Sequence, residues 1–290
     1  MNNLSTQVPA GHALLPDALT LGAVHLNVTD ADRSARFYER SIGLRPGPRE
    51  GNEIHLGTGA GDLLVLHERP DARPAGRHAG LYHFALLHPT RGELGRAARR
   101  LAETGTPISG ASDHGISEAI YLPDPDGNGI ELAADRPPDR WGDLRDPTTI
   151  GPAPLDLPGL MDPVASEELP RHADRDLRVG HLHMHVGDVP EALAYWRDVI
   201  GFEVMTDMSS AAFVAAGGYH HHLGLNVWRG QGVPPAPDDA VGLDRWTVNV
   251  DAPAIAALRE RLERAGAPFR ADGETLLATD PWGTRTLFAP

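Results

Sequence analysis

"LGAVHLNVTDADRSARFYERSIGL" (residues 21–44) returns later in the chain, in altered form, as "VGHLHMHVGDVPEALAYWRDVIGF" (residues 179–202). The two stretches align without a gap and place His25 on His183. Each has alternating residues typical of a strand, an Asp that can cap a helix, an amphipathic stretch and a terminating glycine. The pattern predicts one β-α unit that is used twice.

Two further stretches begin in the same way. Residues 80–108 match residues 242–269, again with a strand, a helix and a glycine stop. Short alternating stretches separated by turns follow each start, such as "EIHLGTG" and "DLLVLHE" after the first. The sequence therefore predicts an α+β fold of four β-α-β-β-β modules.

The order of the modules suggests that consecutive modules form pairs. We expect an N-terminal tail at 1–18, an N-terminal paired-module domain at 19–135, and a C-terminal paired-module domain at 178–290. The segment between them, 136–177, is rich in Pro and Asp and lacks periodicity, which indicates a linker on the surface.

Composition narrows the function further. The chain has 290 residues, a formal net charge of −14 and no cysteine. The negative charge argues against a nucleic-acid partner. No signal peptide and no apolar run of roughly 20 residues is evident, so we expect a cytoplasmic protein without a membrane span. Any metal must be bound by His and carboxylate side chains.

Tandem β-α-β-β-β modules resemble the vicinal oxygen chelate superfamily, which includes glyoxalase I, bleomycin- and fosfomycin-resistance proteins and extradiol ring-cleaving dioxygenases. The resemblance is closest to two-domain catechol 2,3-dioxygenase-like proteins. It implies that each module pair curls a mixed sheet around an open-sided cavity, with helices outside. It also implies that metal ligands come from the first strand of each module of a pair and from the last strand of one or both.

Carried over onto this chain, the resemblance implies a metal site formed by His25, His83 and Glu131. Two imidazoles and one carboxylate form the facial triad that holds Fe(II) and leaves the opposite side open. We therefore expect Fe(II), with Mn(II), Zn(II) and Ni(II) as the alternatives.

The stretch "HGISEAIYLPDPDGNGIE" (114–131) resembles the extradiol dioxygenase signature. It has a His, an apolar residue followed by Tyr, and a D-P-x-G turn that leads to the ligand Glu131. The resemblance implies that His114 and Tyr121 lie beside the metal and contact the bound diol. Both are predicted catalytic residues.

The last strand of the first module ends in His67 and Glu68. Extradiol enzymes place a proton-transferring His at this strand end, whereas glyoxalase I places a fourth metal ligand there. Because neighbouring strand residues point to opposite faces, only one of the two can enter the cavity. An inward His67, the third predicted catalytic residue, favours a dioxygenase; an inward Glu68 favours a four-ligand site suited to proton abstraction.

In the C-terminal pair only His183 keeps its place, because Arg245 and Leu287 occupy the other two ligand positions. Arginine stays protonated and cannot bind a metal. The remaining histidines of this pair are interpreted as a structural remnant, with a second, differently built pocket as the alternative. These are His181, His183, His185, His220, His221 and His222.

The resemblance implies a metal-dependent extradiol dioxygenase of aromatic compound catabolism, whose partners are a small aromatic diol and O2. A homo-oligomer is compatible with it. Two alternatives remain open: a glyoxalase-like lyase, isomerase or thiol transferase, and a non-catalytic protein that binds or sequesters a small molecule.

Overall fold

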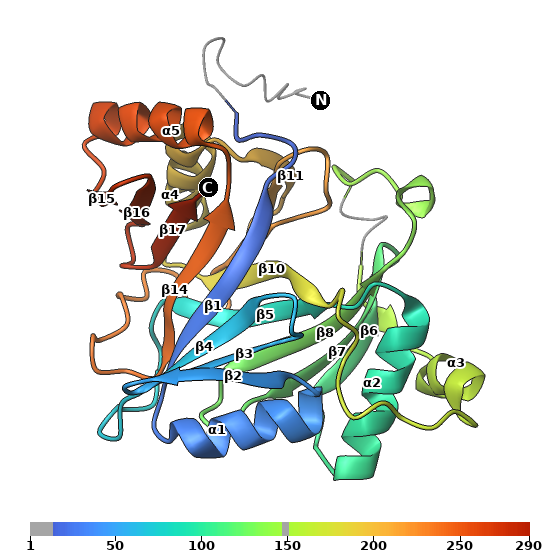
Figure 1. The fold of residues 1–290 in the computed structure, drawn as a ribbon. Coiled ribbons are helices and arrows are strands. Elements are labelled where there is room, and N and C mark those ends of the chain that lie inside the picture. Colours follow the sequence, from blue (N-terminus) through green and yellow to red (C-terminus); the bar gives the residue numbers. More distant parts are fainter. Residues whose placement is uncertain (1–13, 147–150) are drawn as a thin grey trace.

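The protein is built from four β-α-β-β-β modules, as a computed structural model shows for residues 14–146 and 151–290 (Figure 1). The first module comprises β1 (Thr20–Val28), α1 (Ala31–Phe37), β2 (Arg45–Glu50), β3 (Glu53–Gly57) and β4 (Asp62–Glu68). The second comprises β5 (Gly80–Leu87), α2 (Arg91–Thr104), β6 (Gly110–Asp113), β7 (Ser117–Pro123) and β8 (Gly129–Asp135). The predicted α+β class is confirmed.

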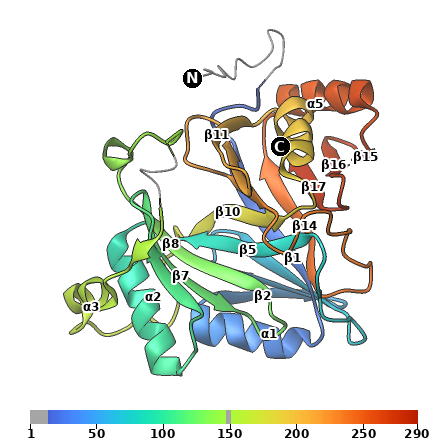
Figure 2. The same ribbon diagram turned by 180° about the vertical axis from the view of Figure 1, so that it is seen from behind.

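The third module comprises β10 (Arg178–His185), α4 (Val189–Leu193), β11 (Glu203–Asp207), β12 (Ala211–Ala215) and β13 (Leu223–Asn226). The fourth comprises β14 (Gly242–Asn249), α5 (Ala252–Ala265), β15 (Phe269–Asp272), β16 (Thr275–Thr279) and β17 (Arg285–Ala289). Figures 1 and 2 show the helices on the outside of two curved sheets.

The modules do not pair in the predicted order. One sheet has eight strands in the order β15-β16-β17-β14-β1-β4-β3-β2, and so joins the first module to the fourth. The other has nine strands in the order β11-β12-β13-β10-β5-β8-β7-β6-β9, and so joins the second module to the third. The predicted boundaries at 19–135 and 178–290 therefore each cut across both sheets. Repeat similarity identifies four first strands but does not say which of them pair.

The repeated β-α unit folds as its sequence predicts. Asp30 and Asp188 cap their helices by accepting backbone N–H groups of the first turn. Both helices continue as short π-helical segments and end at Gly43 and Gly201, whose φ angles are 89° and 99°. Such left-handed angles favour glycine, which explains the glycine at each stop.

The segment between the second and third modules lies against the outside of the fold. It contains η2 (Pro138–Arg140), β9 (Ala153–Pro154), α3 (Leu157–Met161) and η3 (Asp162–Val164). Strand β9 extends the edge of the nine-stranded sheet, and α3 packs on α2. Most of the predicted N-terminal tail lies outside the described residues. None of the helices in the described ranges is long and apolar enough to cross a membrane.

Asp280, in the turn before β17, gives the fold an expected pH dependence. Its Oδ1 accepts the backbone N–H groups of Trp282 at 2.9 Å and Thr284 at 2.8 Å. Its buried Oδ2 has no partner among the described residues. Burial raises the pKa of Asp280 to about 7. In the unfolded chain an Asp titrates near pH 4, so folding favours the protonated acid.

We expect the Asp280 contribution to be fully present below about pH 4 and lost as the pH rises through about 7. The free energy of unfolding should then fall by roughly 2–4 kcal/mol over this range relative to Asp280→Asn, which cannot ionise. Urea unfolding of both proteins at pH 5 and pH 8 measures the difference. An identical pH dependence in the two proteins would contradict the assignment.

Candidate metal centre

Three neighbouring strands in the middle of the nine-stranded sheet supply the candidate ligands. On β5, Ala85 pairs with Glu131 of β8 on one side and with His181 of β10 on the other. Residues that pair across a sheet share a face, as do residues two apart on one strand. His83, two residues before Ala85, therefore joins Glu131 and His181 on the same face.

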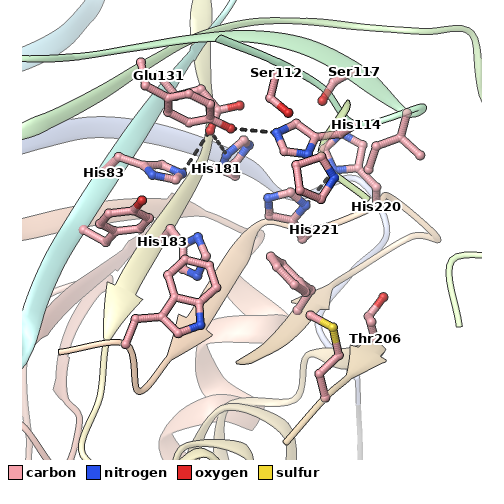
Figure 3. A pocket seen from close by; sticks show the side chains of 17 residues that line it. His83, Ser112, His114, Ser117, Glu131, His181, His183, Thr206, His220 and His221 are labelled. Atoms are coloured by element: carbon pink, nitrogen blue, oxygen red, sulfur yellow. Dashed lines mark hydrogen bonds and ion pairs between the residues drawn. The ribbon is translucent and has the colours of Figure 1, made fainter. Parts of the chain in front are cut away.

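The three side chains meet at the Glu131 carboxylate (Figure 3). Oε2 of Glu131 lies 2.9 Å from Nε2 of His83 and 3.1 Å from Nε2 of His181. One ligand atom from each residue lies within 4.8 Å of the other two, and all three residues are buried. This is a two-histidine, one-carboxylate cluster.

The electrostatics fit a bound divalent cation, which requires neutral imidazoles and an ionised carboxylate. Burial lowers the pKa of His83. Burial alone would raise the pKa of Glu131, but the neighbouring His181 and His83 hold it well below its ordinary value. A buried carboxylate between two imidazoles thus presents the donor set that suits non-haem Fe(II).

His25, a predicted ligand, is not part of this cluster, in which His181 lies beside His83 and Glu131. His25 lies on β1, in the other sheet, with its Nδ1 3.0 Å from Nε2 of His67. The Nδ1 of His67 lies 3.2 Å from a Glu53 carboxylate oxygen. His25 and His67 do lie together, but they belong to the sheet that joins the first and fourth modules.

The structure shows which way His67 and Glu68 point at the end of β4. His67 shares a face with His25, whereas Glu68 Oε1 accepts the backbone N–H of Ala31 in α1 at 3.3 Å. His67 and Glu68 therefore point to opposite faces of the sheet that joins the first and fourth modules. Neither lines the cavity beside the His83–Glu131 cluster.

A cavity of about 390 Å³ opens over the cluster, and the predicted His114 and Tyr121 line it. Tyr121 pairs with Glu131 across the β7–β8 ladder. Its hydroxyl oxygen lies 2.8 Å from Nε2 of His114. Burial and the charge of Glu131 raise the pKa of Tyr121, and burial lowers that of His114. Both side chains are therefore uncharged near pH 7.

The turn before β8 holds Glu131 in place. Asp124 accepts the backbone N–H groups of Asp126 and Asn128 through Oδ1, each at 2.8 Å. Tyr38, in the helical segment of the first module, donates its hydroxyl to Asp124 Oδ2 at 3.0 Å. The D-P-x-G part of the signature thus connects the ligand strand to the other sheet's module.

His221 and His220 also belong to this site, although their sequence position did not predict it. The His221 ring lines the cavity, with its centroid 4.1 Å from that of His181. Its Nδ1 lies 2.8 Å from Nδ1 of His220, whose Nε2 lies 3.0 Å from Asp135 Oδ1. Burial lowers the pKa of His221 well below its ordinary value, so this imidazole is neutral near pH 7.

The signals for these residues are present in the sequence. His181, His183 and His185 alternate along one strand, and three consecutive histidines begin at His220. The expectation of a separate C-terminal pair leads to their interpretation as a remnant. The pairing of the second and third modules places them opposite His83 and Glu131.

Repeated modules, two curved sheets and a buried His-His-Glu cluster beside a cavity are the features that define the class of this protein. The chain belongs to the glyoxalase/bleomycin resistance protein/dioxygenase superfamily, whose family model matches residues 20–132 and 178–286. It is similar to catechol-2,3-dioxygenase of Bacillus subtilis (strain 168), with 40% identity over 268 residues, 90% of this chain and 93% of that protein.

Two solved structures share the fold. A structure from Bacillus subtilis subsp. subtilis str. 168 matches with a TM-score of 0.64 and 12% identity, over 96% of this chain and 86% of the other. Glyoxalase I from Zea mays matches with a TM-score of 0.57 and 16% identity, over 93% and 92%. These likenesses confirm the fold class. The predicted family is confirmed by the family model and by the Bacillus subtilis relative.

Proposed function

We propose that the protein is a metal-dependent extradiol dioxygenase that cleaves the ring of a catechol-type aromatic diol with O2. The observation that carries this proposal is the buried His83–Glu131–His181 cluster at the base of a cavity that also contains Tyr121 and His114. The name and 40% identity of the Bacillus subtilis relative support it.

His83, His181 and Glu131 would hold the metal. A donor set of two imidazoles and one carboxylate would leave coordination positions free for a small diol and O2. When bound, Fe(II) supplies the electron transfer that lets O2 react with an aromatic diol. The protein holds the ligands, orients the diol and moves its protons.

Tyr121 and His114 orient the diol. Because the Tyr121 hydroxyl stays protonated, it can donate a hydrogen bond to a diol oxygen above Glu131. His114 Nε2, 2.8 Å from that hydroxyl, would donate its N–H to the phenol oxygen, which leaves the phenol O–H free for the diol. This agrees with the contact roles that the sequence resemblance implies for the pair.

His221 is the residue best placed to accept a proton from the diol. It lines the cavity and packs on the proposed ligand His181. Its neighbour His220 is hydrogen-bonded to Asp135, which fixes the position of the His220 ring. We therefore assign to His221, in the third module, the proton-transfer role that the sequence resemblance implies for His67.

The glyoxalase-like alternative needs a fourth ligand, usually a carboxylate. Among the described residues that line the cavity, Glu131 is the only acid. A three-ligand site with open positions therefore fits this chain better. A protein that only binds its ligand remains the other alternative, and turnover distinguishes it.

Oxygen uptake tests the proposed function. The protein is reconstituted with Fe(II) without oxygen, and catechols are then added under air. We expect one O2 consumed per diol, together with a yellow ring-opened product. Zn(II)-loaded protein serves as the control, since Zn(II) has no redox chemistry and should give neither signal. Uptake that does not depend on the metal, or none with any catechol, would contradict the proposal.

A further inference from the structure

One side of the cavity is aromatic and is not used by the metal cluster or by the proton-transferring residues. We call it the aromatic wall: Tyr82, Phe213 and Trp228, with His183 between them. The His183 ring centroid lies 5.3 Å from that of Tyr82, 5.5 Å from that of Phe213 and 5.2 Å from that of Trp228. The wall is therefore continuous.

The aromatic wall begins beside a proposed ligand. His183 pairs with His83 across β10 and β5, and their ring centroids are 5.1 Å apart. The Tyr82 centroid lies 4.8 Å from that of His83. Figure 3 shows His183 next to His83 at the edge of the cluster. A diol bound at the cluster would thus direct one edge of its ring toward this wall.

The outer part of the aromatic wall is exposed. Trp228 is 53% exposed and Tyr82 is 40% exposed, although both are large aromatic side chains that line the cavity. Their rings are in edge contact, with centroids 5.5 Å apart. The backbone N–H of Trp228 donates to Asn226 Oδ1 at 3.0 Å, which anchors the segment after β13. An anchored, exposed aromatic pair offers apolar surface that a ligand can cover.

The charge of the cavity selects the kind of group that fits. None of the described residues that line it is an arginine, and the chain contains no lysine. The ionisable acids nearby are Glu131 at the cluster and Asp135 behind His220. A carboxylate on the ligand would meet no cationic side chain among the described lining residues, and desolvating it would cost binding energy.

The volume of the cavity also favours a diol with a substituent. A cavity of about 390 Å³ lies in the range that holds drug-sized ligands, which is more room than one diol ring occupies. Met208 and Ile116 add further apolar lining.

We propose that the aromatic wall seats an uncharged apolar substituent of the substrate, so that the enzyme prefers aryl- or alkyl-substituted diols and rejects carboxylated ones. The inference rests on the proposed function and names its substrate class. Covering Trp228 and Tyr82 supplies binding energy that an unsubstituted diol cannot obtain.

The test compares three diols: catechol, phenylcatechol and 3,4-dihydroxyphenylacetate. For the wild type we expect kcat/KM to be at least about tenfold higher for phenylcatechol than for catechol, and lowest for the carboxylated diol. Trp228→Ala should lower kcat/KM for phenylcatechol about 10–50-fold more than for catechol, mainly through KM. Trp228→Phe should keep most of the wild-type kcat/KM for phenylcatechol. Ile108→Ala, an exposed apolar residue outside the cavity, is the control and should match wild type.

A second readout does not depend on turnover. Calorimetric binding of phenylcatechol to the metal-loaded protein without oxygen should weaken at least about tenfold in Trp228→Ala and stay unchanged in Ile108→Ala. Equal losses for all three diols, or tightest binding of the carboxylated diol, would overturn the proposal. Absence of oxygen uptake with every diol would overturn the proposed function instead, and the binding data would still decide where the substituent lies.

Discussion

His181→Ala is expected to remove nearly all bound divalent metal, whereas His25→Ala should leave the metal content at the wild-type level. His181 supplies one of three ligand atoms that lie within 4.8 Å of one another. Loss of a group that merely supports a ligand weakens metal binding about 10–100-fold, so loss of a ligand should cost more than about 100-fold. Metal analysis after dialysis against a fixed free Fe(II) concentration measures both variants.

The two variants form a matched pair, because each removes a buried histidine from the first strand of a module. Circular dichroism of both variants tests whether they remain folded. Glu131→Ala should behave as His181→Ala does. Full metal content in His181→Ala together with a loss in His25→Ala would return the site to the first and second modules and refute the cluster described above.

His221→Gln is expected to retain metal and to lower turnover by roughly 10²–10⁴, the usual worth of a positioned acid or base. Glutamine keeps polar atoms in the cavity but cannot accept and release a proton near pH 7. Oxygen consumption with a diol at matched iron occupancy measures the effect. The comparison with metal content separates proton transfer from ligand support, since His221 packs on His181.

His67→Gln is the control for this experiment. His67 contacts His25 and Glu53 in the other sheet, outside the cavity lining. Its turnover should stay within about twofold of wild type, since a substitution far from the reacting groups removes no proton transfer. If His67→Gln loses turnover and His221→Gln keeps it, the proton-transferring residue lies in the first module, as the sequence resemblance implied.

Local features of the fold were predictable because they depend on nearby residues. The Asp caps at Asp30 and Asp188 and the stops at Gly43 and Gly201 follow from side-chain hydrogen bonding and from the left-handed φ angle. Glu131 was identifiable because the D-P-x-G turn and the strand after it match the family signature within one short stretch.

The third ligand was not predictable in this way. The first strands of all four modules carry alternating residues, and each could pair with any other on local grounds. Which strand lies beside β5 depends on long-range packing, and a histidine on β1 and one on β10 present the same local pattern. Modules that follow each other in sequence are usually neighbours in space, and this tendency favours His25 over His181.

The second and third modules share one sheet, and the first and fourth modules, which precede and follow them in sequence, share the other. This pairing gives the chain an order of assembly. Every strand of the second and third modules, and hence His83, Glu131 and His181, has been synthesised by residue 226, before β14 begins at Gly242. The sheet around β5 and β10 can therefore close on the ribosome while the first module still lacks its partner. Strand β1 must wait for β14, across most of the chain, and pairings so distant in sequence form slowly. Until then, the exposed side of β1 is an open strand edge that a nascent chain must keep from other chains.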